Sequence, residues 1–126
     1  GVKLFKSHNP DYEDGGQLRD FVYVRDVVDV VAWLSKSPSV NGVFNLGSGQ
    51  ARSFRDLAVA TFQAVGRAPD ITYIDMPEVL RGKYQYYTQA DMSRLRAAGY
   101  SAPMTALEDG VADYVAGYLN TDDPYR

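Results

Sequence analysis

The chain contains no cysteine, which excludes a disulfide framework and any metal site built on thiolates. Histidine occurs once, at His8, so a catalytic pair or a metal cluster made of histidines is also excluded. A chain without disulfides is typical of the cytoplasm, and we expect a cytoplasmic protein.

Long runs of one residue character are missing as well. The longest apolar stretch, residues 27–34, is too short to span a bilayer and is interrupted by Asp29. No basic segment followed by an apolar one opens the sequence, as a signal peptide would. The net charge is −3 without a long basic run, although Arg81 and Lys83 could hold a phosphate locally. We therefore expect neither a membrane nor a nucleic acid as the partner.

What the sequence does contain is the alternation of an α/β protein. Its 126 residues, 45% of them hydrophobic, suffice for one domain with a modest core. Short apolar or β-branched runs predict strands at residues 2–5, 21–24, 43–46 and 71–74. Segments whose apolar residues have helical spacing lie between these runs and after the last one. Strands that alternate with helices indicate an α/β fold with part of a parallel sheet.

Polar residues and glycines mark the expected helix boundaries. Capping aspartates or capping boxes predict helix starts at Asp26, residues 53–56, Asp91 and residues 105–108. Gly66 and Gly99 are placed to end two helices in the left-handed conformation. Residues 121–126 read as a polar, frayed tail.

A Gly-Ser-Gly sequence follows the run at residues 43–46. The bare backbone of Gly47 and Gly49 could approach an anion closely, which suggests a phosphate-binding loop. The third glycine and the acidic partner of a dinucleotide fingerprint are missing, however. We therefore interpret these residues as a turn.

Arg19 and Asp20 introduce the most informative stretch of the chain. Residues 19–27 read Arg-Asp-Phe-Val-Tyr-Val-Arg-Asp-Val. This stretch resembles the R-D-F-V-Y-V-x-D-V segment of the nucleotide-sugar epimerases and dehydratases, which belong to the extended short-chain dehydrogenase/reductase family. The resemblance implies that Arg19 binds the phosphates of a sugar nucleotide. From the residues alone, Arg19 could also simply pair with Asp20 or with another nearby acid.

Three later segments narrow the resemblance to one branch of that family. Gly-Lys-Tyr-Gln at residues 82–85, Thr-Gln-Ala-Asp at residues 88–91 and Leu-Arg-Ala-Ala-Gly-Tyr at residues 95–100 are similar to segments of the enzymes that epimerise an ADP-activated heptose. For these enzymes the resemblance implies an NADP-dependent inversion of C6 by transient oxidation and reduction, in the biosynthesis of lipopolysaccharide core heptose. An ADP-sugar is then the expected substrate.

The same resemblance implies which residues bind that substrate. Tyr84 corresponds to a tyrosine that contacts it, and the wall of the site corresponds to Phe5, Lys6, Ser7 and His8. The residues themselves leave an alternative open, because residues 6–18 are polar and rich in turn formers and could form a solvated hairpin. Tyr86 and Tyr87 could likewise pack on their own domain.

Two sequence features of a complete enzyme of this family are missing. The chain has neither a G-x-x-G-x-x-G loop nor a Tyr-x-x-x-Lys pair. We therefore expect residues 1–126 to be a single C-terminal substrate-binding fragment, inactive alone and without catalytic or cofactor-binding residues. The N-terminal dinucleotide-binding domain, which would bind NADP, is expected to be absent. Apolar surfaces left uncovered predict association, as a homo-oligomer or with the missing part.

Two other functions remain open at this point. Another nucleotide-sugar epimerase or a 4,6-dehydratase of the same superfamily would carry the same general motif. A non-catalytic binding or interaction module, complete at this length, belongs to a different class. The upstream reading frame would distinguish this module from an enzyme fragment.

Overall fold

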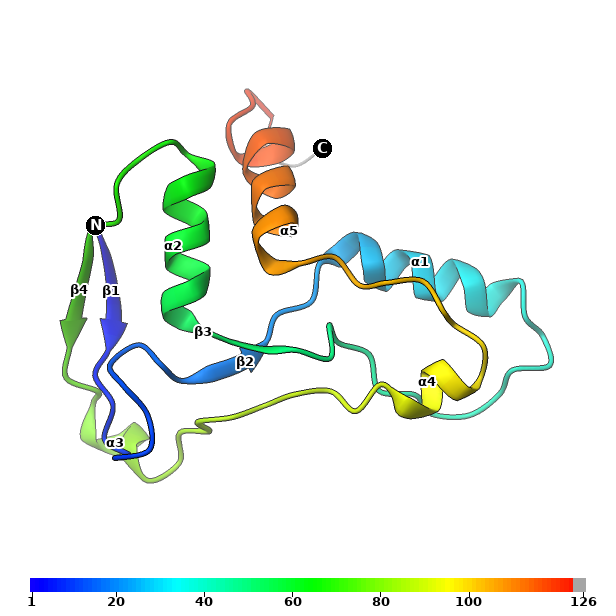
Figure 1. The fold of residues 1–126 in the computed structure, drawn as a ribbon, viewed down its shortest axis with the longest axis horizontal. Helices are drawn as coiled ribbons and strands as arrows, with labels where there is room; N and C mark the ends of the chain where they lie inside the picture. Colours follow the sequence, from blue (N-terminus) through cyan, green and yellow to red (C-terminus); the bar gives the residue numbers. More distant parts are fainter. Residues whose placement is uncertain (124–126) are drawn as a thin grey trace.

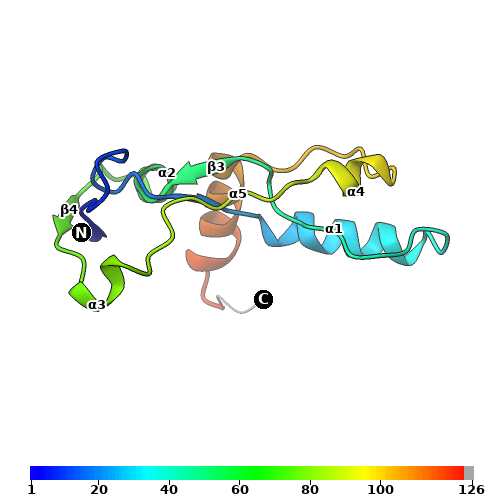
Figure 2. The same ribbon diagram turned by 90° about the horizontal axis from the view of Figure 1, so that it is seen from below.

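The computed structural model describes residues 1–123. Its elements in chain order are β1 (Val2–Phe5), β2 (Leu18–Asp20), α1 (Val24–Ser35), β3 (Ala51–Ser53), α2 (Phe54–Ala64), β4 (Ile71–Ile74), α3 (Glu78–Arg81), α4 (Ser93–Ala97), α5 (Leu107–Tyr114) and the π-helical turn η1 (Val115–Leu119). The molecule is elongated, with β1 and β4 at one end and α1 and α4 at the other (Figure 1, Figure 2). The last three residues of the expected tail, 124–126, lie outside the described residues.

Two small sheets form the β structure. β1 and β4 pair in parallel, with Val2 opposite Ile71, and β2 and β3 pair antiparallel, with Arg19 opposite Arg52. The strands predicted at residues 2–5 and 71–74 are thereby confirmed. So is an α/β arrangement that includes a small parallel sheet.

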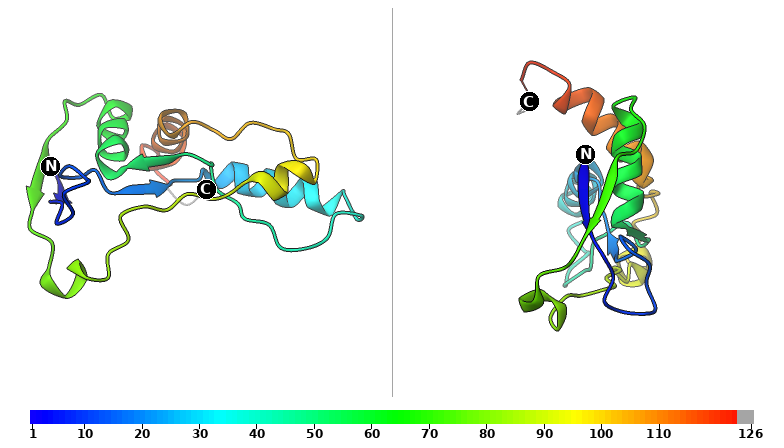
Figure 3. Two further views of the ribbon diagram at one scale, coloured as in Figure 1. Left: turned by 60° about the horizontal axis from the view of Figure 1, so that its bottom comes forward. Right: turned by 90° about the vertical axis from the view of Figure 1, so that its left-hand side faces the viewer.

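The helix α2 begins as the sequence predicts. The hydroxyl of Ser53 accepts a hydrogen bond from the N–H of Asp56 at 2.9 Å, and the Asp56 carboxylate accepts from the N–H of Ser53 at 3.1 Å. Beyond its end, Gly66 has a φ of +69°, as expected for a left-handed terminus. The helices α2 and α5 stand side by side across the long axis of the molecule (Figure 3).

A hydrophobic core joins α1 to α4. Val30, Leu95 and Tyr100 are buried at its centre, and Trp33 meets Tyr100 edge-on with their ring centroids 5.4 Å apart. Partly buried apolar side chains surround this centre: Trp33, Leu34, Phe44, Leu46, Met92 and Met104. From α1 the core takes Val30, Trp33 and Leu34, whereas Val31 is 59% exposed.

The strand predicted at residues 43–46 is wrong. Phe44 and Leu46 pack on the core, but Val43 is 79% exposed, and the segment joins neither sheet of the described part of the chain. A strand needs a neighbour to pair its backbone groups. Within residues 1–123 this segment has none, so it does not form a strand.

The strand predicted at residues 21–24 is also wrong, because β2 lies three residues earlier. Pairing with β3 ends at Asp20, and the ring of Phe21 packs edge-on against Phe54 at a centroid distance of 5.5 Å. The carbonyl of Tyr23 already accepts a hydrogen bond from the N–H of Asp26, as the first turn of α1 forms.

Two of the predicted helix caps are wrong for a common reason. The side chain of Asp26 does not cap α1; it is buried, and its carboxylate accepts hydrogen bonds from the N–H and the hydroxyl of Thr105, both at 2.7 Å. Thr105 in turn does not cap α5, which begins at Leu107 without a side-chain cap. Asp26 and Thr105 therefore form hydrogen bonds with each other across the fold, and neither caps the end of its own helix.

The predicted start of α4 is close to the observed one. Asp91 accepts a hydrogen bond from the N–H of Ser93, the first helical residue, although the cap position belongs to Met92. Gly99 follows the helix with a φ of +108°, as predicted. No helix in residues 1–123 combines the length and apolar character that crossing a membrane requires.

Candidate functional site

Arg19 lies in β2, between two segments that come from distant parts of the sequence. On one side it faces β3. On the other side, the N–H of Leu18 donates to the carbonyl of Tyr86 at 2.8 Å, and the N–H of Thr88 donates to the carbonyl of Leu18 at 3.2 Å. These backbone hydrogen bonds hold the segment of residues 84–90 along β2 and bring Tyr84 next to Arg19.

The guanidinium of Arg19 lies among aromatic rings. Its central carbon is 5.3 Å from the centroid of the Tyr84 ring and 5.8 Å from that of Phe54. Tyr84 also meets Phe5 edge-on, at 6.2 Å between centroids. The structure thus brings Phe5, Arg19 and Tyr84 together in one cluster.

Within the described part of the chain, the guanidinium of Arg19 has no acidic partner. One of its terminal N–H groups donates to the carbonyl of Leu18 at 2.7 Å. None of the salt bridges found within residues 1–123 includes Arg19. The alternative that Arg19 pairs with Asp20 is wrong, because the Asp20 carboxylate accepts its hydrogen bonds elsewhere.

A hollow of about 180 Å³ opens beside this cluster. Its lining comes from β1, from the end of the following loop, from the start of α2 and from the aromatic segment: Lys3, Leu4, Phe5, Gln17, Phe54 and Tyr84. Ligand pockets usually measure about 300–1,000 Å³. The hollow can therefore hold part of a nucleotide sugar but not all of it.

The other residues predicted for the substrate wall have different surroundings. The ammonium of Lys6 pairs with the carboxylate of Asp75 at 3.2 Å. The hydroxyl of Ser7 donates to the carbonyl of Asn9 at 2.7 Å, and the side chain of His8 lies in an exposed position.

One hydrogen bond links this loop to the aromatic segment. The N–H of His8 donates to the hydroxyl of Tyr86 at 2.8 Å. Within the described residues, no hydrogen bond, salt bridge or ring contact joins the side chains of Lys6, Ser7 or His8 to Arg19. The solvated-hairpin interpretation accounts for much of this loop, while Phe5 belongs to the cluster.

Gln17, which the sequence did not single out, and Asp20, which it suggested only as a partner for Arg19, hold the cluster in place. Gln17 is buried, and its amide donates to the carbonyls of Phe5 at 3.3 Å and Lys6 at 3.4 Å, which fixes the end of β1. Asp20 accepts hydrogen bonds from the Gly-Ser-Gly turn and from Ala90. The predicted turn at residues 47–49 could have approached an anion, and the anion that it binds is the Asp20 carboxylate of the chain itself.

Hydrogen bonding controls the ionisation of Asp20. Burial raises the pKa of its carboxyl, but hydrogen bonds from the Ser48 hydroxyl and from the N–H groups of Ala90, Ser48 and Gly49 outweigh burial. The pKa therefore lies below its ordinary value. Asp20 is a carboxylate at neutral pH.

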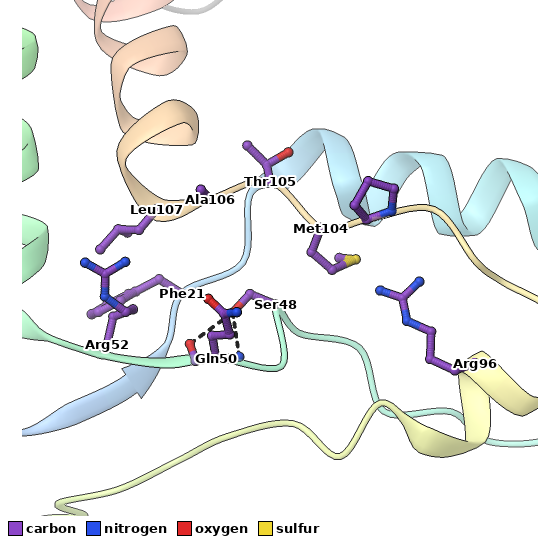
Figure 4. Close-up of a pocket in the computed structure, with 10 residues that line it drawn as sticks. Phe21, Ser48, Gln50, Arg52, Arg96, Met104, Thr105, Ala106 and Leu107 are labelled. Carbon is purple, nitrogen blue, oxygen red and sulfur yellow. Dashed lines mark hydrogen bonds between the residues drawn. The ribbon is translucent and has the colours of Figure 1, made fainter.

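A second hollow, of about 340 Å³, lies between the glycine turn, β3 and the linker to α5 (Figure 4). Two arginines line it, but both are engaged: Arg52 pairs with Asp56 and Glu108, and Arg96 donates to the carbonyls of Tyr100 and Ala102. None of the predicted substrate residues lines this hollow.

Comparison with known proteins shows what the chain is similar to. The sequence profile described as the NAD dependent epimerase/dehydratase family matches residues 3–47. ADP-L-glycero-D-manno-heptose-6-epimerase of Nitratidesulfovibrio vulgaris is 56% identical over 124 residues, which make up 98% of this chain and 38% of that protein. The chain thus spans little more than a third of the length of this relative.

Solved structures show a similar relationship. The ADP-L-glycero-D-manno-heptose-6-epimerase of Helicobacter pylori matches 92% of this chain, and 32% of its own, with a TM-score of 0.70 and 32% identity. The UDP-glucose 4-epimerase of Thermus thermophilus, solved in complex with NAD, matches 88% of this chain and 33% of its own, with a TM-score of 0.68 and 27% identity.

Proposed function

We propose that this chain, a homologue of the ADP-L-glycero-D-manno-heptose-6-epimerases over 98% of its length, forms the substrate-binding portion of such an enzyme. The enzyme would invert C6 of an ADP-activated heptose. The observation that supports this role is the contact of the Arg19 guanidinium with the ring of Tyr84, which also meets Phe5. Tyr84 and Phe5 line the hollow of about 180 Å³, whereas Arg19 is not among its lining residues.

The surroundings of Arg19 suit a pyrophosphate group. The planar guanidinium presents several N–H donors in a fixed fork, which matches phosphate oxygens better than an ammonium does. The rings of Tyr84 and Phe54 flank it, and the carbonyl of Leu18 occupies one N–H group. The remaining donors would bind the diphosphate, and Tyr84 would cover the same ligand.

The glycine turn at residues 47–49 does not fit the phosphates of NADP. The N–H groups of Ser48 and Gly49, which could receive an anion, already bind the Asp20 carboxylate. The chain also lacks the glycine-rich fingerprint of a dinucleotide-binding loop. We therefore propose that NADP and the catalytic residues belong to a separate dinucleotide-binding domain, and that residues 1–126 alone are inactive.

An apolar face of α1 supports this division. Val24, Val28 and Val31 follow one another at helical spacing with exposures of 55%, 59% and 59%, and the unpaired Val43 is 79% exposed. We propose that the dinucleotide-binding domain covers this face. The protein would also associate as a homo-oligomer, which light scattering of the intact protein would measure.

The test of the proposed function is substrate choice. Purified intact protein should invert C6 of the ADP-heptose, followed by NMR, and leave UDP-glucose and dTDP-glucose unchanged. Turnover of a UDP-sugar would instead support a 4-epimerase, the second candidate, which the similarity to the Thermus enzyme favours.

A reading frame that continues about two hundred residues upstream is also expected, since that is the size of one further domain. A frame that starts near Gly1 would support a non-catalytic binding module.

A further inference from the structure

We propose that Asp20 is a positioning residue that holds Arg19 and the Tyr84 segment in register for ligand binding. This inference rests on the proposed function of the cluster around Arg19. Its basis is the number and origin of the hydrogen bonds that the Asp20 carboxylate accepts.

Four donors from two distant segments converge on this carboxylate. One oxygen accepts from the N–H of Ser48 at 2.6 Å and from its hydroxyl at 2.5 Å. The other oxygen accepts from the N–H of Gly49 at 3.0 Å and from that of Ala90 at 2.9 Å. Asp20 therefore connects the end of β2 to the glycine turn and also to residues 84–90, the Tyr84 segment.

The hydrogen bond to Ala90 completes a two-point attachment of that segment. Leu18 holds the middle of the segment through the backbone of Tyr86 and Thr88, and Asp20 holds its end at Ala90. Arg19 lies between these two points in β2. Losing the bond at Ala90 would leave the segment attached to β2 at Leu18 alone, so that it could pivot there and shift the ring of Tyr84 relative to the guanidinium.

The turn is built closely around the carboxylate. A Cβ atom at Gly47 would lie 2.4 Å from a carboxylate oxygen of Asp20 and 2.7 Å from the Cβ of Ala90. An asparagine at position 20 could not replace the aspartate, because its amide has one acceptor oxygen and its NH₂ group would face N–H donors. Four donors require both oxygens of an ionised carboxylate.

The experiment measures ligand affinity in the intact protein. Titration calorimetry of ADP-heptose against Asp20→Asn should show binding about tenfold weaker than wild type, because small displacements of a binding group carry large penalties. Ser48→Ala removes one of the four donors and should weaken binding about threefold while the fold is retained. The matched control is Asp56→Asn, whose carboxylate also accepts backbone and side-chain hydrogen bonds but has none to the Tyr84 segment. It should lower the melting temperature and leave the affinity unchanged.

The affinities and melting temperatures together distinguish a positioning role of Asp20 from a merely structural one. If Asp20→Asn and Ser48→Ala bind ADP-heptose as tightly as wild type, with only a lower melting temperature, Asp20 is merely structural and the inference fails. If wild-type protein itself does not bind ADP-heptose, the proposed function fails, and crystal structures of wild type and Asp20→Asn decide the inference separately. A guanidinium that stays over the Tyr84 ring in the variant would overturn it, and a displaced one would support it.

Discussion

The guanidinium carbon of Arg19 lies 5.3 Å from the centre of the Tyr84 ring, although one residue comes from a strand and the other from a distant loop. Backbone hydrogen bonds between Leu18 and the Tyr84 segment create this contact. The two residues that the family resemblance singled out separately therefore share one location. This relationship allows the contribution of each side chain to be tested on its own.

Replacing Arg19 by alanine should weaken substrate binding by about 1.5–3 kcal/mol, the range for hydrogen bonds to a charged group. Arg19→Lys should recover part of the loss, since an ammonium keeps the charge but not the planar fork. Calorimetry of intact protein with the ADP-heptose measures both. Arg67→Ala, which removes an exposed arginine beyond α2, is the control and should bind normally. Unchanged affinity in Arg19→Ala would remove Arg19 from the site.

The ring of Tyr84 should matter more than its hydroxyl. Its ring contacts Arg19, Phe5 and Tyr86. Tyr84→Phe keeps these contacts and should bind ligand nearly as wild type, whereas Tyr84→Ala should lose about 1 kcal/mol or more of affinity through lost ring and cation–π contacts. The exposed Tyr87 provides the control variant Tyr87→Ala. A larger loss in Tyr84→Phe than in Tyr87→Ala would show that the hydroxyl binds the ligand directly.

Asp26 should stabilise the fold through its bonds to Thr105. Asp26→Ala leaves the N–H and hydroxyl of Thr105 without their acceptor, so the free energy of unfolding should fall by about 1.5–3 kcal/mol. Asp29→Ala removes an exposed aspartate from the same helix and should change stability by less than about 0.5 kcal/mol. Chemical denaturation measures both. Equal effects of the two substitutions would contradict this account.

The stability of the α2 capping box should depend on pH in the acid range. Burial raises the pKa of Asp56, but hydrogen bonds from Ser53 and Arg52 outweigh it, so the pKa of the folded state is lowered. Asp56 therefore contributes stability above its unfolded pKa of about 3.9, and this contribution disappears as the pH falls through the lower folded pKa. Between pH 5 and pH 3, the melting temperature of wild type should drop more than that of Asp56→Asn. Parallel curves would show that the carboxylate is not stabilised by folding.

Local features of the fold could be predicted from the sequence, because the residues that form them are close together in the chain. The capping box of α2 needs only residues 53–56, and the apolar runs of β1 and β4 are continuous. The predicted caps at Asp26 and Thr105 failed because these side chains bond to each other over 79 residues. Residues 43–46 have a strand-like sequence, but whether a strand forms depends on a neighbouring chain segment.

Only part of the candidate site could be predicted from the sequence. Family resemblance pointed to Arg19, Tyr84 and Phe5, and the structure places them together, but their substrate-binding role remains a prediction. Asp20 could not be found in this way, because its donors belong to residues 48, 49 and 90, which only the folded backbone brings to it.

The parallel pairing of β1 with β4 has a consequence for the order of folding. Val2 pairs with Ile71, so this contact closes a long loop and cannot form until most of the chain is available. The helices α1 and α2 rely on neighbours a few residues away and can form first. During synthesis, β1 therefore lacks β4, its partner in the described part of the chain, until residues 71–74 have been made. In that interval the unpaired edge of β1 is open to pairing with a strand of another chain.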